Sequence, residues 1–157
     1  MKGNSDEKPV VSSSRGFIGS KTEPDKIAEE ITMIQTLQNK TKGLRIRGEI
    51  ARIDKQELGT KKLRDICSVA EKFCGYYLGN GHQAAYGIFD YGNRYEIKYA
   101  INTVNFADGS KYRHNNCEIQ DRELNCLNTV IADVTGQSIS EDCRFDFDML
   151  EYSGITD

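Results

Sequence analysis

The sequence predicts an α/β domain in which helices pack against a small sheet. Two segments, 61–78 and 115–136, carry apolar residues at the three- and four-residue spacing of helices with one buried face. Between them, residues 82–102 read as a β-hairpin, and residues 144–152 read as a last strand. This order of helix, hairpin, helix and strand predicts a three-layer sandwich, with extra helices at the N-terminal end.

The strands are indicated by a change in the spacing of apolar residues. The runs over 82–90 and 94–102 are rich in Tyr, Ile and Phe, and Gly92 between them suits a tight turn. Within the second run, alternate residues from Tyr95 share one face. Apolar and charged residues also alternate over 144–152. We therefore expect three strands after the helix over 61–78.

The N-terminal part is predicted to be a flexible leader, 1–20, followed by one domain, 21–157. The leader is rich in Ser, Gly and charge. It would be ordered only if its large apolar side chains found a docking groove: Val10, Val11, Phe17 and Ile18. Isoleucines at helical spacing predict helices over 21–58, including a polar one over 46–58. The remaining core would cover 61–152.

The overall charge limits the classes of partner. The 157-residue chain has 21 Lys and Arg against 24 Asp and Glu, a net charge of −3. We therefore expect no strong footprint for duplex nucleic acid, although a single nucleotide or base remains compatible as a substrate. No apolar run approaches the roughly 20 residues that span a bilayer. The sequence thus predicts no membrane partner. Its N-terminus lacks the apolar h-region of a signal peptide, so we expect none.

The cysteines indicate neither a disulfide scaffold nor a zinc ribbon. Their number is odd and no two have the spacing of a CxxC motif. Free cysteines are commonly buried, so we expect small core side chains in a reducing compartment. The five are Cys67, Cys74, Cys117, Cys126 and Cys143.

Glu123 is the polar residue with the clearest functional signal. It precedes Leu127 by one helical turn and so lies beside the apolar stripe of the 115–136 helix. A carboxylate that faces a core must be paired, protonated or bound to metal, because an isolated buried charge is very unfavourable. The structural alternative is that Asp121 caps the N-terminus of the helix and that the negative charge of Glu123 interacts favourably with the helix dipole.

The order of elements resembles the cytidine-deaminase-like fold. The resemblance rests on a hairpin that ends in Asn102, on a polar loop, and on a helix that opens with the D-x-E of Asp121 and Glu123. More narrowly, the chain resembles the deaminase toxin domains of bacterial polymorphic toxins. The resemblance implies a zinc-dependent hydrolase acting on a nucleobase or nucleotide. Asp121 would ligate zinc, Glu123 would shuttle protons, and Asn102 and Tyr99 would contact the substrate.

The same resemblance implies a cognate immunity protein as partner. It also implies localisation in the cytoplasm, or secretion as the C-terminal part of a larger toxin. The family's Pro-Cys-x-x-Cys ligand motif does not follow the last predicted strand, so we expect a truncated or inactive form. The alternative is a non-catalytic protein-binding domain of the immunity or adaptor type.

Other candidate sites rest on weaker patterns. His114, Cys117, Cys126 and Cys143 could form a scattered metal site, although their spacing matches no zinc module. Cys117 near a helix start, with His114 three residues earlier, could form a thiol nucleophile and its base. The tyrosines between residues 76 and 112 could stack on bases or fill half-buried hairpin positions.

Overall fold

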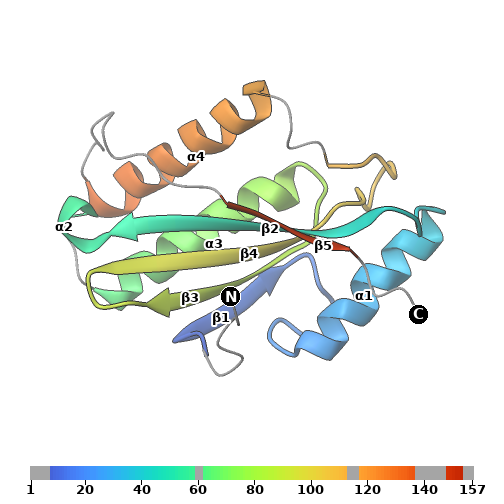
Figure 1. Ribbon diagram of the computed structural model, residues 1–157, viewed down its shortest axis with the longest axis horizontal. Coiled ribbons are helices and arrows are strands. Elements are labelled where there is room, and N and C mark those ends of the chain that lie inside the picture. The colour runs from blue at the N-terminus through green and yellow to red at the C-terminus, as the bar shows by residue number, and fades with distance from the viewer. Residues whose placement is uncertain (1–7, 59–61, 113–116, 137–147, 154–157) are drawn as a thin grey trace.

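A computed structural model describes residues 8–58, 62–112, 117–136 and 148–153 as one mixed α/β unit (Figure 1). Its sheet is antiparallel at every pairing, in the order β1-β3-β4-β2-β5. The strands are β1 (Val11–Arg15), β2 (Leu44–Asp54), β3 (Ala84–Asp90), β4 (Arg94–Asn102) and β5 (Asp148–Ser153). The helices are α1 (Pro24–Leu37), α2 (Lys55–Leu58), α3 (Leu63–Gly79) and α4 (Cys117–Thr135).

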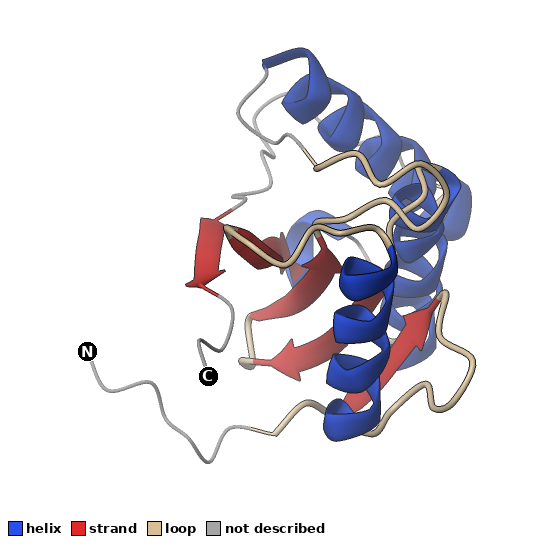
Figure 2. Ribbon diagram, turned by 90° about the vertical axis from the view of Figure 1, so that its right-hand side faces the viewer, coloured by secondary structure: helices blue, strands red, loops and turns tan. Residues whose placement is uncertain are grey.

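The main core lies between α3 and one face of the sheet. The apolar face of α3 places Phe73 and Tyr77 against Ile97 and Ile101 of β4, and all four are buried. Helix α4 packs on α3 and adds Leu127 to this core. Figures 1 and 2 show α4 at the top of the molecule and α1 below it, well apart. The two helices therefore cover different parts of the sheet.

The hairpin and both predicted long helices are confirmed. Strands β3 and β4 pair from Ala84 with Ile101 to Asp90 with Tyr95, and Gly92 adopts the left-handed conformation in the turn. The 115–136 helix is α4, and the 61–78 helix is α3. The last strand, β5, begins at Asp148, and the preceding part of the predicted strand lies outside the described residues. Cys74 is a buried core thiol, as expected.

Two predictions for the N-terminal part are wrong. The expected helix over 46–58 is strand β2 followed by the single turn α2. Ile46 and Ile50 face one side of this strand and Ile53 faces the other, so their apparent helical spacing comes from a strand flanked by β4 and β5. The leader is ordered over Val11–Arg15, because β1 completes the free edge of β3.

The connection from α3 to β3 depends on Gly81. Its φ is +90°, and an added Cβ would overlap the Asn105 side chain. That side chain is fixed, since its amide donates to the Asn80 carbonyl at 2.9 Å and its oxygen accepts from Ala107 N at 2.8 Å. We expect Gly81→Ala to lower the free energy of unfolding by about 2 kcal/mol, measured by urea denaturation.

Gly79→Ala is the matched control. Gly79 ends the same helix, has no neighbour within 4 Å of an added Cβ and does not have positive φ. The substitution should be neutral or stabilising by about 0.5–1 kcal/mol. Equal losses in both variants would contradict the role given to Gly81.

Candidate functional site

Two carboxyl side chains meet in the interior between β2 and α4. Glu123 faces inward on the same side of α4 as Leu127, and its side chain is 0% exposed. Glu49 of β2 faces the same core as Ala51 and Ile53, and it is also 0% exposed. The expectation that Glu123 faces the interior is confirmed, and its partner is a residue from a distant part of the chain.

Tyr77 and Arg47 surround the pair. The Tyr77 hydroxyl, on α3, donates a hydrogen bond to Glu49 Oε2. Arg47 precedes Glu49 by two residues on the same strand, so both side chains share one face of the sheet. The Arg47 guanidinium lies 5.7 Å from the centre of the Tyr112 ring. A phenol, a guanidinium and two carboxyls are thus brought together from three elements, and the Tyr112 ring joins them from a loop.

Burial sets the protonation of the two acids. The pKa of Glu123 is raised to about 9, first by burial and then by the negative charge of Glu49 and the hydrogen bond between the two carboxyls, against the charge of Arg47. Burial also raises the pKa of Glu49 to about 7, opposed by hydrogen bonds from Tyr77 and Glu123 and by the charge of Arg47. At neutral pH Glu123 is therefore protonated, and its carboxyl group donates a hydrogen bond to Glu49.

This arrangement can both accept and donate a proton. Two carboxyls whose surroundings separate their pKa values can take the roles of base and acid in one reaction. Glu49 is poised near neutral pH as the base, while Glu123 remains the acid. Arg47 supplies a positive charge that favours the ionised form of Glu49.

Asp121 does not share this site. Its side chain is exposed, whereas Glu123 is buried. Successive helix positions are about 100° apart, so residues two apart point in nearly opposite directions. Nor does Asp121 cap the helix, since α4 begins at Cys117. The D-x-E pair is therefore divided between the surface and the interior.

Tyr99 borders the site but is held by a backbone contact. Its ring centre lies 5.4 Å from that of Tyr77, and its strand position pairs with Glu49. The Tyr99 hydroxyl donates to the Ala70 carbonyl of α3 at 3.0 Å. Other tyrosines of this region, such as Tyr86 and Tyr95, are likewise buried in the core. Their packing agrees with the alternative that these tyrosines fill positions of the hairpin rather than stack on bases.

Asn102 lies on the other face of the sheet. It is 0% exposed, and its Oδ1 accepts from Gln35 Nε2 and from Val104 N, both at 3.0 Å. Its Nδ2 donates to Gln83 Oε1 at 2.9 Å. Asn102 therefore links α1 to the start of β3 and to the end of β4. The structure does not bring it to Glu123.

The described residues do not fit a zinc ion. No group of three or more His, Cys, Asp or Glu side chains in that part of the chain could hold a metal. Asp121, the expected ligand, points away from Glu123. His114, Cys143 and the side chain of Cys117 lie outside what the structure describes, so the scattered metal site and the Cys117–His114 pair stay predictions.

Comparison with models of known protein families, with curated protein sequences and with solved structures found no match. Within the described residues, no helix has the length and apolar character needed to cross a membrane.

Sequence reasoning missed Glu49, Arg47 and Tyr77. Reading 46–58 as a helix hid the alternation that places Arg47, Glu49, Ala51 and Ile53 on one face of β2. Two charged residues at consecutive inward positions of a strand were the available signal. Tyr77 lies in the apolar stripe of the predicted 61–78 helix, and no local pattern indicates that its hydroxyl has a carboxyl partner.

Proposed function

We propose that the protein is a hydrolase that removes an amino group from a nucleobase or nucleotide, with Glu49 and Glu123 as its proton-transferring groups. The observation that carries the proposal is the fully buried carboxyl pair, whose members have separated pKa values. The nucleobase as substrate comes from the resemblance to deaminase toxin domains. The three-layer sandwich that we propose as the fold comes from the order of the helices and strands. No step is assigned to a metal.

The two acids divide the proton transfers of the reaction. Ionised Glu49 accepts a proton from water as the water oxygen bonds to the ring carbon that bears the amino group. Protonated Glu123 gives its proton to that amino group, which leaves as ammonia. The Tyr77 hydroxyl is a positioning group, since it donates to Glu49 and holds that carboxylate in one orientation. Because both carboxyls are fully buried, a substrate reaches them only when the groups covering them shift.

Ammonia release tests this proposal. The full chain is incubated with cytosine and adenine nucleosides, their nucleotides, and single-stranded DNA and RNA. Glu123→Gln and Glu49→Gln each remove one proton-transferring group, so each should lower kcat by about 10²–10⁴-fold. Glu29→Gln makes the same chemical change at an exposed position of α1 and should leave the rate unchanged.

Asp121→Asn separates this mechanism from the metal site implied by the resemblance. The carboxyl-pair mechanism predicts no change, whereas a zinc ligand at Asp121 predicts loss of activity together with loss of bound zinc. Full activity in Glu123→Gln, or loss of activity on chelation, would contradict the carboxyl-pair mechanism. Melting temperatures of all variants distinguish lost chemistry from lost folding.

The pH profile of the reaction should be bell-shaped. Glu49 must be ionised and Glu123 protonated, so the rate should be highest between about pH 7 and pH 9. Tyr77→Phe removes a hydrogen bond that lowers the pKa of Glu49, so it should move the acid limb to higher pH. An unchanged acid limb would show that Glu49 is not the base.

The alternative is the non-catalytic binding domain. It is favoured by the zero exposure of both carboxyls, since a buried acid pair can serve stability alone. In that case no substrate would be turned over, and Glu123→Gln would change stability only. An immunity-type or adaptor-type partner would then be expected to bind the protein surface.

A further inference from the structure

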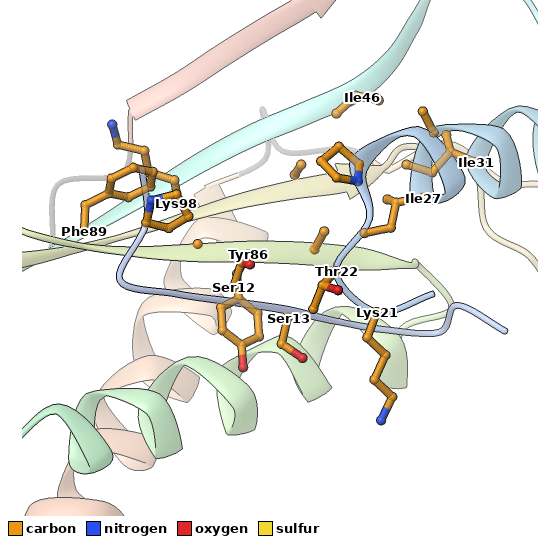
Figure 3. A pocket seen from close by; sticks show the side chains of 16 residues that line it. Ser12, Ser13, Lys21, Thr22, Ile27, Ile31, Ile46, Tyr86, Phe89 and Lys98 are labelled. Carbon is orange, nitrogen blue, oxygen red and sulfur yellow. The ribbon is translucent and has the colours of Figure 1, made fainter. Parts of the chain in front are cut away.

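Helix α1 exposes two large apolar side chains on its outer face. Met33 is 49% exposed and Leu37 is 71% exposed. They are four residues apart, so they are neighbours on one side of the helix. Ile27 and Ile31 face the other way, since they line a pocket of about 410 Å³ between α1 and the sheet (Figure 3). Figure 2 shows α1 in front of the sheet, with no other described helix or strand over its outer side.

The charges of this region are separated along the chain. Residues 23–30 hold four carboxyl side chains and one lysine. Residues 31–39 hold no charged side chain, and residues 40–45 hold three basic side chains and no acidic one. From its beginning to the turn that follows it, α1 therefore has an acidic end, an uncharged middle with the two exposed apolar side chains, and a basic end.

Glu29 and Lys40 border the apolar pair on its two sides. Both are exposed, and neither forms an ion pair within the part of the chain that the structure describes. Burial, together with the positive charges of Lys40 and Arg45, lowers the pKa of Lys111, so several cations lie close together at the basic end. A carboxylate from another molecule would reduce this repulsion, so the basic end favours an acidic partner surface.

We propose that the outer face of α1 is an interface between two copies of this chain, whose α1 helices pack antiparallel about a two-fold axis. In this arrangement Met33 of each copy meets Leu37 of the other. The acidic end of each helix then meets the basic end of the other, and Glu29 faces Lys40 of the second copy. The symmetry produces each of these contacts twice. A parallel arrangement would instead place like charges side by side.

The order of the charges is the reason for choosing a second copy as the partner. A two-fold interface needs a surface that is complementary to itself, and an acidic end and a basic end on either side of an apolar pair meet that need. The helix has 14 residues and is therefore about 21 Å long. A contact of this length falls below the roughly 1,200 Å² of a standard stable interface, so we expect weak association that is reversed by dilution. The interface does not involve the carboxyl pair.

Sedimentation equilibrium of the full chain over a range of concentrations measures the association. Leu37→Ser removes an apolar contact twice in each dimer, so it should weaken association by more than about tenfold. Leu63→Ser is the matched control, because Leu63 is an apolar side chain that is 40% exposed at the start of α3. It should leave the association unchanged.

Reversal of charge tests the antiparallel orientation. Glu29→Lys and Lys40→Glu each bring like charges together at both symmetric contacts, so each should weaken association by about tenfold. The double variant Glu29→Lys/Lys40→Glu restores opposite charges and should associate within about threefold of the wild-type chain. Arg64→Glu, at an exposed position of α3, is the control and should have no effect.

The proposal fails on any of three results. The first is a wild-type chain that stays monomeric up to about 1 mM, the concentration at which even a weak pair forms. The second is association that Leu37→Ser does not weaken, since the copies would then meet at another surface. The third is a double variant that associates no better than the single ones, because the acidic and basic ends would then not meet. If Leu37→Ser does not fold, the charge variants still decide.

Discussion

The protein should lose about 2–3 kcal/mol of unfolding free energy between pH 7 and pH 9. The ordinary pKa of a Glu side chain is 4.5, and burial raises those of Glu49 and Glu123 to about 7 and about 9. Over this range the folded protein therefore binds more protons than the unfolded chain, so its stability falls as pH rises. Each pH unit over which one such proton is held corresponds to about 1.4 kcal/mol. Urea denaturation at pH 7, 8 and 9 measures the effect.

Below pH 7 a second group opposes this trend. Burial lowers the pKa of His82, so its contribution to stability is lost as the pH falls. The range from pH 7 to pH 9 therefore excludes His82, and the raised pKa values of the Cys67, Cys74 and Cys126 thiols add a smaller fall only as the pH approaches 9. Glu123→Gln, which keeps a hydrogen-bond donor without a titrating proton, should remove most of the slope. A wild-type stability that is constant or rises over this range would contradict the buried pair.

Local patterns were sufficient for much of the fold. Helices α3 and α4 and the β3–β4 hairpin follow from apolar spacing and from a turn at Gly92, all of which are readable over short segments. The inward direction of Glu123 was readable for the same reason, because it lies one turn from Leu127. Each of these features depends on residues that are near one another in the chain.

Strand β2 could not be read in this way because it carries the site. A strand with one buried face usually shows an apolar residue at every second position. Arg47 and Glu49 occupy two such inward positions, and this left isoleucines on both faces that imitate helical spacing. Where local rules fail, a functional or strained site is a frequent reason. The partner of Glu123 was therefore hidden by the residues that compose the site.

The two substrate contacts implied by the resemblance, Tyr99 and Asn102, do not lie on the same face of the sheet, because side chains alternate along a strand. Tyr99 and Asn102 are three residues apart on one strand, so their side chains must face opposite sides of the sheet. The register of β4 places Tyr99 towards the carboxyl pair and Asn102 towards α1. The opposite directions of Tyr99 and Asn102 could be predicted from their spacing in the sequence. The hydrogen-bond partners of Asn102 could not, because they come from distant segments that no local pattern reveals.

Asn102→Ala should lower the free energy of unfolding by about 3 kcal/mol. The change leaves the buried amide N–H of Val104 and the Oε1 of Gln83 without their Asn102 partners, and it removes one of two acceptors from Gln35 Nε2. A buried polar group left without its hydrogen bond costs about 1–3 kcal/mol. Urea denaturation at pH 7 measures the loss.

The comparison that decides the role of Asn102 uses stability and kinetics together. Asn125→Ala makes the same change at an exposed position of α4 and should leave stability within about 0.5 kcal/mol. If Asn102 joins α1 to the sheet, its alanine variant loses stability while KM at temperatures well below unfolding is unchanged. A variant with wild-type stability and a raised KM would instead place Asn102 at the substrate. The structure predicts the first result, because the three hydrogen bonds of the Asn102 side chain are all made within the protein.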